Sequence, residues 1–287
     1  MTGRGQRPEE PRPITPPDPT LATRPVPQTR SYIARPFGPA ATNDIQRTAR
    51  SMTELEAEAD PTTHPQGPEN YYPSVDETRK LLKEVENWTF VEDDPTWGYY
   101  VFVTTYSDSA REKLPQALAN WVKVVQKCLS IGTLPIYSDE AFRRFKFNVV
   151  EDRDALDAAS VDRVREEFHA QIRGLRLGGS DNEDDDPRTS GFMPPARNQA
   201  CLLLDEAAIT MLANIDSLPD DAVEFCRIYN HKTVTVVDGF WNRSRQDPRE
   251  TYRGVGQLAV AGLVGFYLNL TMDANADAMQ DLHPIND

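Results

Sequence analysis

Short blocks of apolar residues, separated by polar ones, recur between residues 97 and 270, and each has the length of a strand or a helix. The segment from Tyr99 to Tyr106 is almost wholly β-branched or aromatic, which is typical of a strand packed on a core. A continuous apolar run at 200–204 predicts a strand that is buried on both faces. Further strands are predicted at 145–150, 233–237 and 257–260.

Helical periodicity separates these strands. Ser74 and Glu77 have the spacing of a capping box, which predicts that a helix begins there. Apolar residues spaced by three and four predict a long amphipathic helix that starts either at Pro115, or near Ser109 with a kink at the proline. Other helices are predicted at 138–144, 160–172, 205–215 and 263–270.

The order of the strongest elements is strand–helix–strand, an interposed helix, and strand–helix–strand again. This order predicts the α+β class, with a ferredoxin-like split βαβ sheet, helices on one face of it, and extra helices as additions. Because strands and helices also alternate, a small doubly wound sheet is the alternative.

The N-terminal segment has a different composition. Residues 1–73 hold 14 of the 23 prolines and few apolar residues, which predicts a disordered Pro-rich tail. Within it, 11–17 and 24–27 favour polyproline II, a form that docks on aromatic grooves of partner proteins, and 51–59 has the pattern of a transient acidic helix. We therefore expect one α+β domain at 74–272, containing an acidic loop at 178–197, and a flexible C-terminus at 273–287.

The net charge of −14 is unevenly spread, because residues 1–50 carry eight Arg against four acidic residues and the remainder is strongly acidic. An acidic domain repels phosphate backbones, so we expect no nucleic-acid partner. No apolar run approaches the ~20 residues of a membrane span. The three cysteines are odd in number and far apart, which favours a reducing compartment and a cytoplasmic location. The sequence does not indicate an oligomeric state.

Several short motifs occur in a characteristic order: Trp97-Gly98 before the first strand, Glu151-Asp152-Arg153 after the second, and Val236-Val237-Asp238 followed by Trp241. Over roughly 88–272, this arrangement resembles a group of filamentous-fungal α+β proteins that has no established activity. The resemblance implies an intracellular α+β domain, and it assigns no catalytic residues.

The candidates for chemistry are acidic residues at the predicted carboxyl ends of strands. They are Asp152, Asp205 and Asp238, which would gather at one edge of a doubly wound sheet but need not converge in a ferredoxin-like one. The competing interpretation makes Asp205 a helix cap and Asp238 part of a turn. Trp97, Tyr99 and Trp241 are candidates for lining a ligand pocket near those ends. The four histidines lack the spacing of metal ligands, so we expect no metal site and no cofactor.

Two functions follow from these patterns. The first is a non-catalytic intracellular protein that acts through protein contacts, because no catalytic motif is present and the tail is of a partner-binding type. The alternative is a small enzyme, or a small-molecule-binding accessory protein of fungal specialised metabolism, that uses the strand-end carboxylates.

Overall fold

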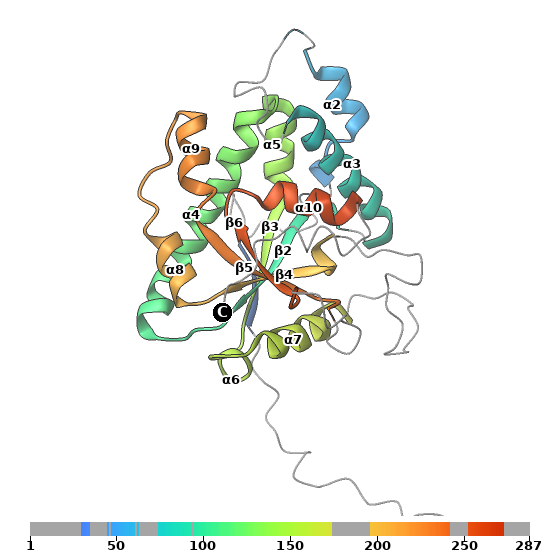
Figure 1. Ribbon diagram of the computed structural model, residues 1–287. Helices are drawn as coiled ribbons and strands as arrows, with labels where there is room; N and C mark the ends of the chain where they lie inside the picture. The colour runs from blue at the N-terminus through green and yellow to red at the C-terminus, as the bar shows by residue number, and fades with distance from the viewer. Residues whose placement is uncertain are drawn as a thin grey trace, which may run out of the picture.

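The computed structural model describes residues 30–34, 45, 47–60, 62, 74–92, 94–173, 196–241 and 252–272 (Figure 1). Its strands form one six-stranded mixed sheet in the order β1-β3-β2-β4-β5-β6. The strands are β1 (Arg30–Ala34), β2 (Trp97–Val103), β3 (Phe145–Glu151), β4 (Ala200–Leu204), β5 (Thr233–Asp238) and β6 (Val255–Ala259). The protein is therefore an α+β protein, as its sequence predicts.

The centre of the sheet is parallel and its margins are antiparallel. β2 pairs in parallel with β3 on one side and with β4 on the other. β1 runs antiparallel to β3, β5 antiparallel to β4, and β6 antiparallel to β5. β2 therefore lies in the middle of the sheet. The chain forms β3 on one side of it and then β4 on the other.

The two connections between the parallel strands cross opposite faces of the sheet. From β2 to β3 the chain passes through α4 (Asp108–Gly132) and α5 (Pro135–Arg144). From β3 to β4 it passes through α6 (Arg153–Leu156) and α7 (Val161–Arg173), which lie on the other side (Figure 1). Two crossovers on opposite faces are the pattern of a doubly wound sheet.

The ferredoxin-like prediction is therefore corrected in its details. A split βαβ unit would place an antiparallel strand between the first two strands of the domain, whereas β2 and β3 pair directly and in parallel. Helices also cover both faces and not one (Figure 1). The same order of strands and helices along the chain is compatible with a ferredoxin-like and with a doubly wound sheet. The two differ in which strands lie next to each other, and here β2 lies between β3 and β4.

The remaining helices are α2 (Met52–Glu58), α3 (Val75–Glu92), α8 (Glu206–Ala213), α9 (Ala222–Tyr229), α10 (Leu263–Met272) and the short 3-10 helix η2 (Ala196–Asn198). The predicted capping box is present, since the Ser74 amide donates to Glu77 and the Glu77 amide donates to Ser74. α4 begins at Asp108, capped by Ser107, and contains Pro115 in its interior. The predicted start near Ser109 is therefore closer to the observed one than the alternative start at Pro115.

Both faces of β2 are buried, and its side chains alternate between two helical layers. Tyr100 and Phe102 meet the Phe168 ring of α7 edge-on. Trp97 and Tyr99 point the other way, toward Tyr267 of α10. Every residue of β2 and of β4 is buried, which confirms the prediction made from the apolar run of β4.

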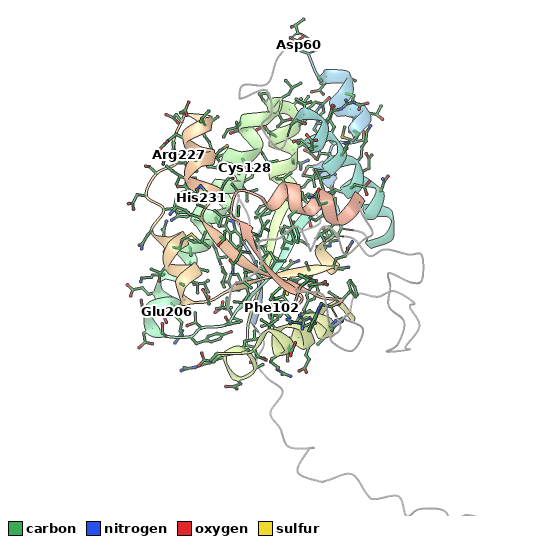
Figure 2. The ribbon with its side chains drawn as sticks, in the orientation of Figure 1. Asp60, Phe102, Cys128, Glu206, Arg227 and His231 are labelled. Atoms are coloured by element: carbon green, nitrogen blue, oxygen red, sulfur yellow. The ribbon has the colours of Figure 1, made fainter. Side chains whose placement is uncertain are left out.

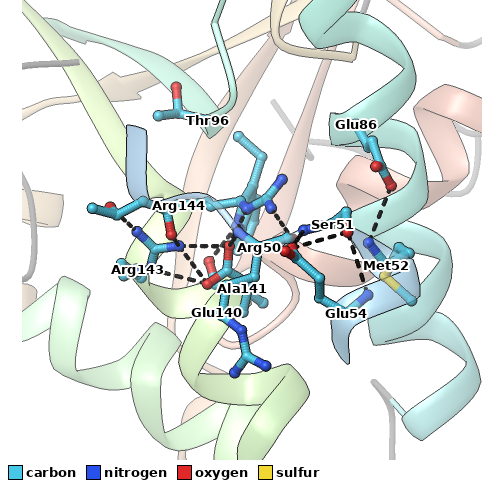
Figure 3. A network of polar contacts seen from close by, with 12 residues as sticks. Arg50, Ser51, Met52, Glu54, Glu86, Thr96, Glu140, Ala141, Arg143 and Arg144 are labelled. Carbon is cyan, nitrogen blue, oxygen red and sulfur yellow. Dashed lines mark hydrogen bonds and ion pairs between the residues drawn. The ribbon is translucent and has the colours of Figure 1, made fainter. Parts of the chain in front are cut away.

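Part of the predicted tail belongs to the folded domain. Met52 and Leu55 of α2 are buried in the main core. Just before α2, the Arg50 amide donates to the Glu140 carboxylate at 3.1 Å, and the Arg144 guanidinium donates to the Arg50 carbonyl at 2.6 Å (Figure 3). These bonds hold Arg50 on α5, although it precedes the expected domain boundary at residue 74.

A second leader segment, β1, completes one edge of the sheet. Its register with β3 runs from Arg30 opposite Glu151 to Ala34 opposite Phe147. The polyproline segments at 11–17 and 24–27, the acidic loop up to residue 195 and the C-terminus at 273–287 lie outside the described residues.

Candidate functional site

The carboxyl ends of β2, β3 and β4 lie at one edge of the sheet, because these three strands are parallel. Asp152 follows β3 and Asp205 follows β4, so the structure places both at this edge. Asp238 ends β5, which runs the other way, and its register partner is Ala200 at the start of β4. Asp238 is therefore at the opposite edge, and the three candidate carboxylates do not converge.

Asp152 and Asp205 each cap a helix. Asp152 is 5% exposed and its Oδ1 accepts from the Ala155 amide at 3.1 Å, at the start of α6. Asp205 is exposed and its Oδ1 accepts from the Ala208 amide at 2.7 Å, at the start of α8. A side-chain oxygen in this position satisfies an amide that has no partner within its own helix. The capping interpretation of Asp205 is thus correct in this structure.

The loops at this edge are bonded to one another across the point where the strand order reverses. The Thr104 amide donates to the Leu204 carbonyl at 3.0 Å, and the Ala158 amide donates to the Thr104 carbonyl at 3.0 Å. The Ser107 hydroxyl donates to Glu206 at 3.1 Å. In doubly wound sheets the loops diverge here and leave a crevice for ligands. In this protein the same loops are joined by hydrogen bonds.

Tyr106 connects the ends of β2 and β3. Its hydroxyl donates to the Val103 carbonyl at 3.0 Å and accepts from the Asp152 amide at 2.7 Å. Burial raises the pKa of this phenol well above its usual value, and the bond from the Asp152 amide opposes that rise only in part. Tyr106 is therefore a neutral hydrogen-bonding bridge between two loops.

The opposite edge holds the other acidic candidate, together with Trp241. We call the residues around the end of β5 and the start of β6 the β5–β6 corner: Arg165, His169, Asp238, Gly239, Trp241, Tyr252 and Gly254. Asp238 is 2% exposed, and its two carboxylate oxygens accept from the Phe240 amide at 2.8 Å and from the Tyr252 hydroxyl at 3.3 Å. Asp238 does form a turn, as the competing interpretation predicts. It also accepts a hydrogen bond from Tyr252, in the segment that leads into β6.

Arg165 of α7 organises the β5–β6 corner. Its guanidinium donates to the carbonyls of Asp238 at 2.8 Å and Gly254 at 3.2 Å. It also lies 5.0 Å from the centre of the Trp241 ring, within range of a cation–π contact. Gly254 has φ +74°, and a Cβ there would lie 2.4 Å from the Trp241 side chain, so this close approach requires glycine.

The next turn of α7 contributes His169, whose Nε2 lies 2.5 Å from the Gly239 carbonyl oxygen. Because a carbonyl only accepts, this nitrogen carries a proton. Neither Arg165 nor His169 was predicted to belong to a functional site. Their spacing of four residues, which puts them on one helix face, was the available signal.

Trp97 and Tyr99 lie in the core and not beside the acidic candidates. Both are 0% exposed. The Trp97 indole donates to the Ala141 carbonyl at 2.7 Å, and the Tyr99 hydroxyl donates to the Leu263 carbonyl at 2.8 Å. Large buried aromatic residues with a satisfied polar atom are typical of a structural core. Of the three aromatic candidates, only Trp241 is beside an acidic candidate, Asp238.

A separate charged cluster closes the amino ends of β2 and β3. Asp94 accepts from Lys146 at 2.6 Å and from Arg197 at 2.9 Å, and the two basic side chains are 7% and 6% exposed. Burial alone would raise the pKa of Asp94, but the two cations outweigh it and lower the pKa to about 2. Gly98 permits the strands to approach here, since a Cβ at this residue would lie 1.8 Å from the Lys146 carbonyl oxygen.

Phe102 lies at the centre of the fold, whereas Glu206 lies at the exposed start of α8 and His231 on the turn before β5 (Figure 2). Within the described ranges, His, Cys, Asp and Glu side chains form no group of three that suits a metal ion. Among the same residues, every helix is too short or too polar to cross a membrane. Comparisons with protein-family models, with curated proteins and with solved structures found no match.

Proposed function

We propose that this protein is a non-catalytic intracellular module that acts through protein contacts made by its N-terminal leader. The observation that carries the proposal is the anchoring of the leader at two places. β1 is paired to the edge of the sheet, and α2 is packed on the core. Arg30, the residue that follows the Pro-rich segment 1–29, therefore has a defined position beside β3. The polyproline segments within 1–29 are suited to aromatic grooves on a partner.

The hydrogen bonds made by Asp152 and Asp205 support the same proposal. Asp152 and Asp205 cap helices with the oxygens that a metal or a proton-transfer step would require. The loops around them are bonded together where a doubly wound sheet usually receives its ligand. The carboxyl edge is thus built for rigidity, and the polar groups there serve the fold.

The proposal is tested by affinity purification from cells that express the chain. The full chain is compared with a chain that lacks residues 1–29, which removes the polyproline segments and leaves β1 in place. A chain lacking 273–287 is the matched control, because it also removes a terminal segment outside the described residues. We expect partners to be lost only from the first deletion. Identical partners for all three chains would contradict the role of the leader.

One observation favours the alternative, a small enzyme or small-molecule-binding accessory protein of fungal specialised metabolism. The β5–β6 corner brings a carboxylate, an imidazole, a guanidinium and an indole together at one end of the sheet. For this function, a metabolite extract from the same cells should raise the melting temperature of the native chain but not that of Trp241→Phe. An equal response of the two chains would count against it.

A further inference from the structure

β1 differs from the other strands in how it is held. It occupies the outer edge of the sheet, and the strand that it pairs with is β3. Ten residues, 35–44, separate it from the next described residue, Ile45. The remaining strands are each joined to helices that pack on the core (Figure 1). β1 is therefore a separate segment added to a sheet that the rest of the chain builds.

β1 pairs with β3 through its backbone, and two of its side chains also pack against the core. Ile33 is 38% exposed, whereas Tyr32 and Ala34 are partly buried against the core. Beneath them, Phe147 and Val149 of β3 are 0% exposed. Backbone pairing does not distinguish sequences, and the selectivity of an added strand comes from alternate side chains. Tyr32 and Ala34 occupy the alternate positions that reach the core.

Without β1, β3 would be an edge strand with a long apolar sequence. Phe147, Val149 and Val150 are all nearly inaccessible, and the backbone groups on their outer side would lack a partner strand. An apolar edge of this kind is a template for another extended segment. β1 thus covers a surface that is suited to strand addition.

We propose that the outer edge of β3 is a binding site for an extended segment of a partner protein, and that β1 is its intramolecular competitor. The segment runs antiparallel to β3, with an aromatic residue opposite Val149 and a small residue opposite Phe147, as Tyr32 and Ala34 do. A basic residue in this segment complements the net negative charge of the chain. The inference rests on the proposed function, since it names the surface at which a protein contact is made.

The short connection between β1 and the domain determines how strong the competition is. Ten residues tether β1 to Ile45, and a tether of this length gives an effective concentration on the order of millimolar. A partner segment of equal intrinsic affinity is therefore excluded at ordinary concentrations while β1 is in place. Anything that withdraws the leader, such as a contact made by residues 1–29, opens the edge of β3.

The experiment uses the full chain and a fluorescent peptide with the sequence of residues 28–36. Binding is measured by anisotropy to the native chain and to the double variant Ser31→Pro and Tyr32→Pro, because adjacent prolines cannot continue a paired strand. Ala22→Pro with Thr23→Pro is the matched control, with two prolines in the leader outside β1. We expect at least tenfold tighter binding to the β1 variant, and native affinity in the control.

Hydrogen exchange gives an independent readout in the same chains. Amides of β3 should exchange faster in the β1 variant and recover protection when the peptide is added, while amides of β2 stay unchanged, which also shows that the variant is folded. Equal peptide affinity for the native and β1-variant chains, or no binding to either, would overturn the proposal. Tighter peptide binding together with partners that survive removal of 1–29 would retain the edge site and reject only the proposed role of the polyproline segments.

Discussion

The Glu140 carboxylate and the Arg144 guanidinium lie 2.6 Å apart, one turn from each other on α5, and each side chain is 4% exposed. The same carboxylate accepts from the Arg50 amide, and Arg144 donates to the Arg50 carbonyl. A buried ion pair is thus the point at which the leader enters the domain. Such a pair costs much when one partner is removed, because the other charge is left buried.

We predict that Glu140→Gln lowers the free energy of unfolding by about 3 kcal/mol, because Arg144 would lose its charged partner while remaining buried. Hydrogen exchange should also accelerate in 47–58 before it does in the central strands. Denaturant unfolding and exchange measure the two effects. Glu224→Gln is the control, since Glu224 pairs with Arg227 on the exposed surface of α9, and we expect no measurable change there.

Asp94 should give the domain a stability that depends on pH. Burial opposes its ionisation, but Arg197 and Lys146 lower its pKa from 3.8 to about 2. The ionised native carboxylate therefore contributes about 2 kcal/mol above pH 4, and this contribution is lost as pH falls toward 2. Asp94→Asn should be less stable than the native chain by at least this amount at pH 7.

The measurement is a series of denaturant titrations between pH 7 and pH 2. The difference between the native chain and Asp94→Asn should shrink as the pH falls below 4, because the native carboxyl group becomes neutral as well. Asp139→Asn, at an exposed position of α5, should follow the native curve throughout. A difference that stays constant with pH would show that the carboxylate charge is not responsible.

Ala158 has φ 53°, in the left-handed region that favours glycine, and its amide donates to the Thr104 carbonyl at 3.0 Å. We predict that Ala158→Gly raises the free energy of unfolding by about 0.5–1 kcal/mol, because it removes the steric cost of this conformation. Ala159→Gly is the matched control and should destabilise, since it adds freedom to the unfolded chain and removes a partly buried methyl group. Thermal unfolding of the two variants distinguishes a local backbone effect from a general response to glycine.

Thr133 follows α4 and is 3% exposed, and its hydroxyl has no hydrogen-bond partner among the described residues. We predict that Thr133→Val stabilises the protein by about 1 kcal/mol, because it replaces a desolvated hydroxyl by a methyl group of similar size. Thr78→Val provides the contrast. Thr78 is equally buried but donates to the Ser74 carbonyl at 3.1 Å, so its loss should destabilise. If both variants lose stability, the Thr133 hydroxyl has a partner in solution.

Local structure was predicted well wherever one segment carried its own signal. The capping box of Ser74 and Glu77 marked the start of α3, and the apolar run at 200–204 marked β4 as buried on both faces. The topology of the sheet could not be predicted from these local patterns. The order of strands in the sheet depends on the side to which each crossover returns, and neither periodicity nor spacing records it.

The candidate site could not be predicted fully either, because its geometry depends on the order and direction of the strands. Asp238 follows a strand as Asp152 and Asp205 do, but the direction of β5 places it at the other edge. The β5–β6 corner joins α7 to residues at least seventy positions later. The bonds come from Arg165 and His169, and no local sequence pattern predicts them. β1 was missed because five residues flanked by proline-rich sequence carry too little apolar pattern to distinguish a strand from a tail.

The pairing of β1 with β3 has a consequence for synthesis on the ribosome. Ala34 is made more than one hundred residues before Phe147, its register partner. At about 5–20 residues per second, the nascent leader waits on the order of ten seconds before the strand that receives it has been translated. The strand at this edge of the sheet is thus the first of the six described strands to be synthesised, well before its partner. During that interval it is accessible to whatever else binds extended chains.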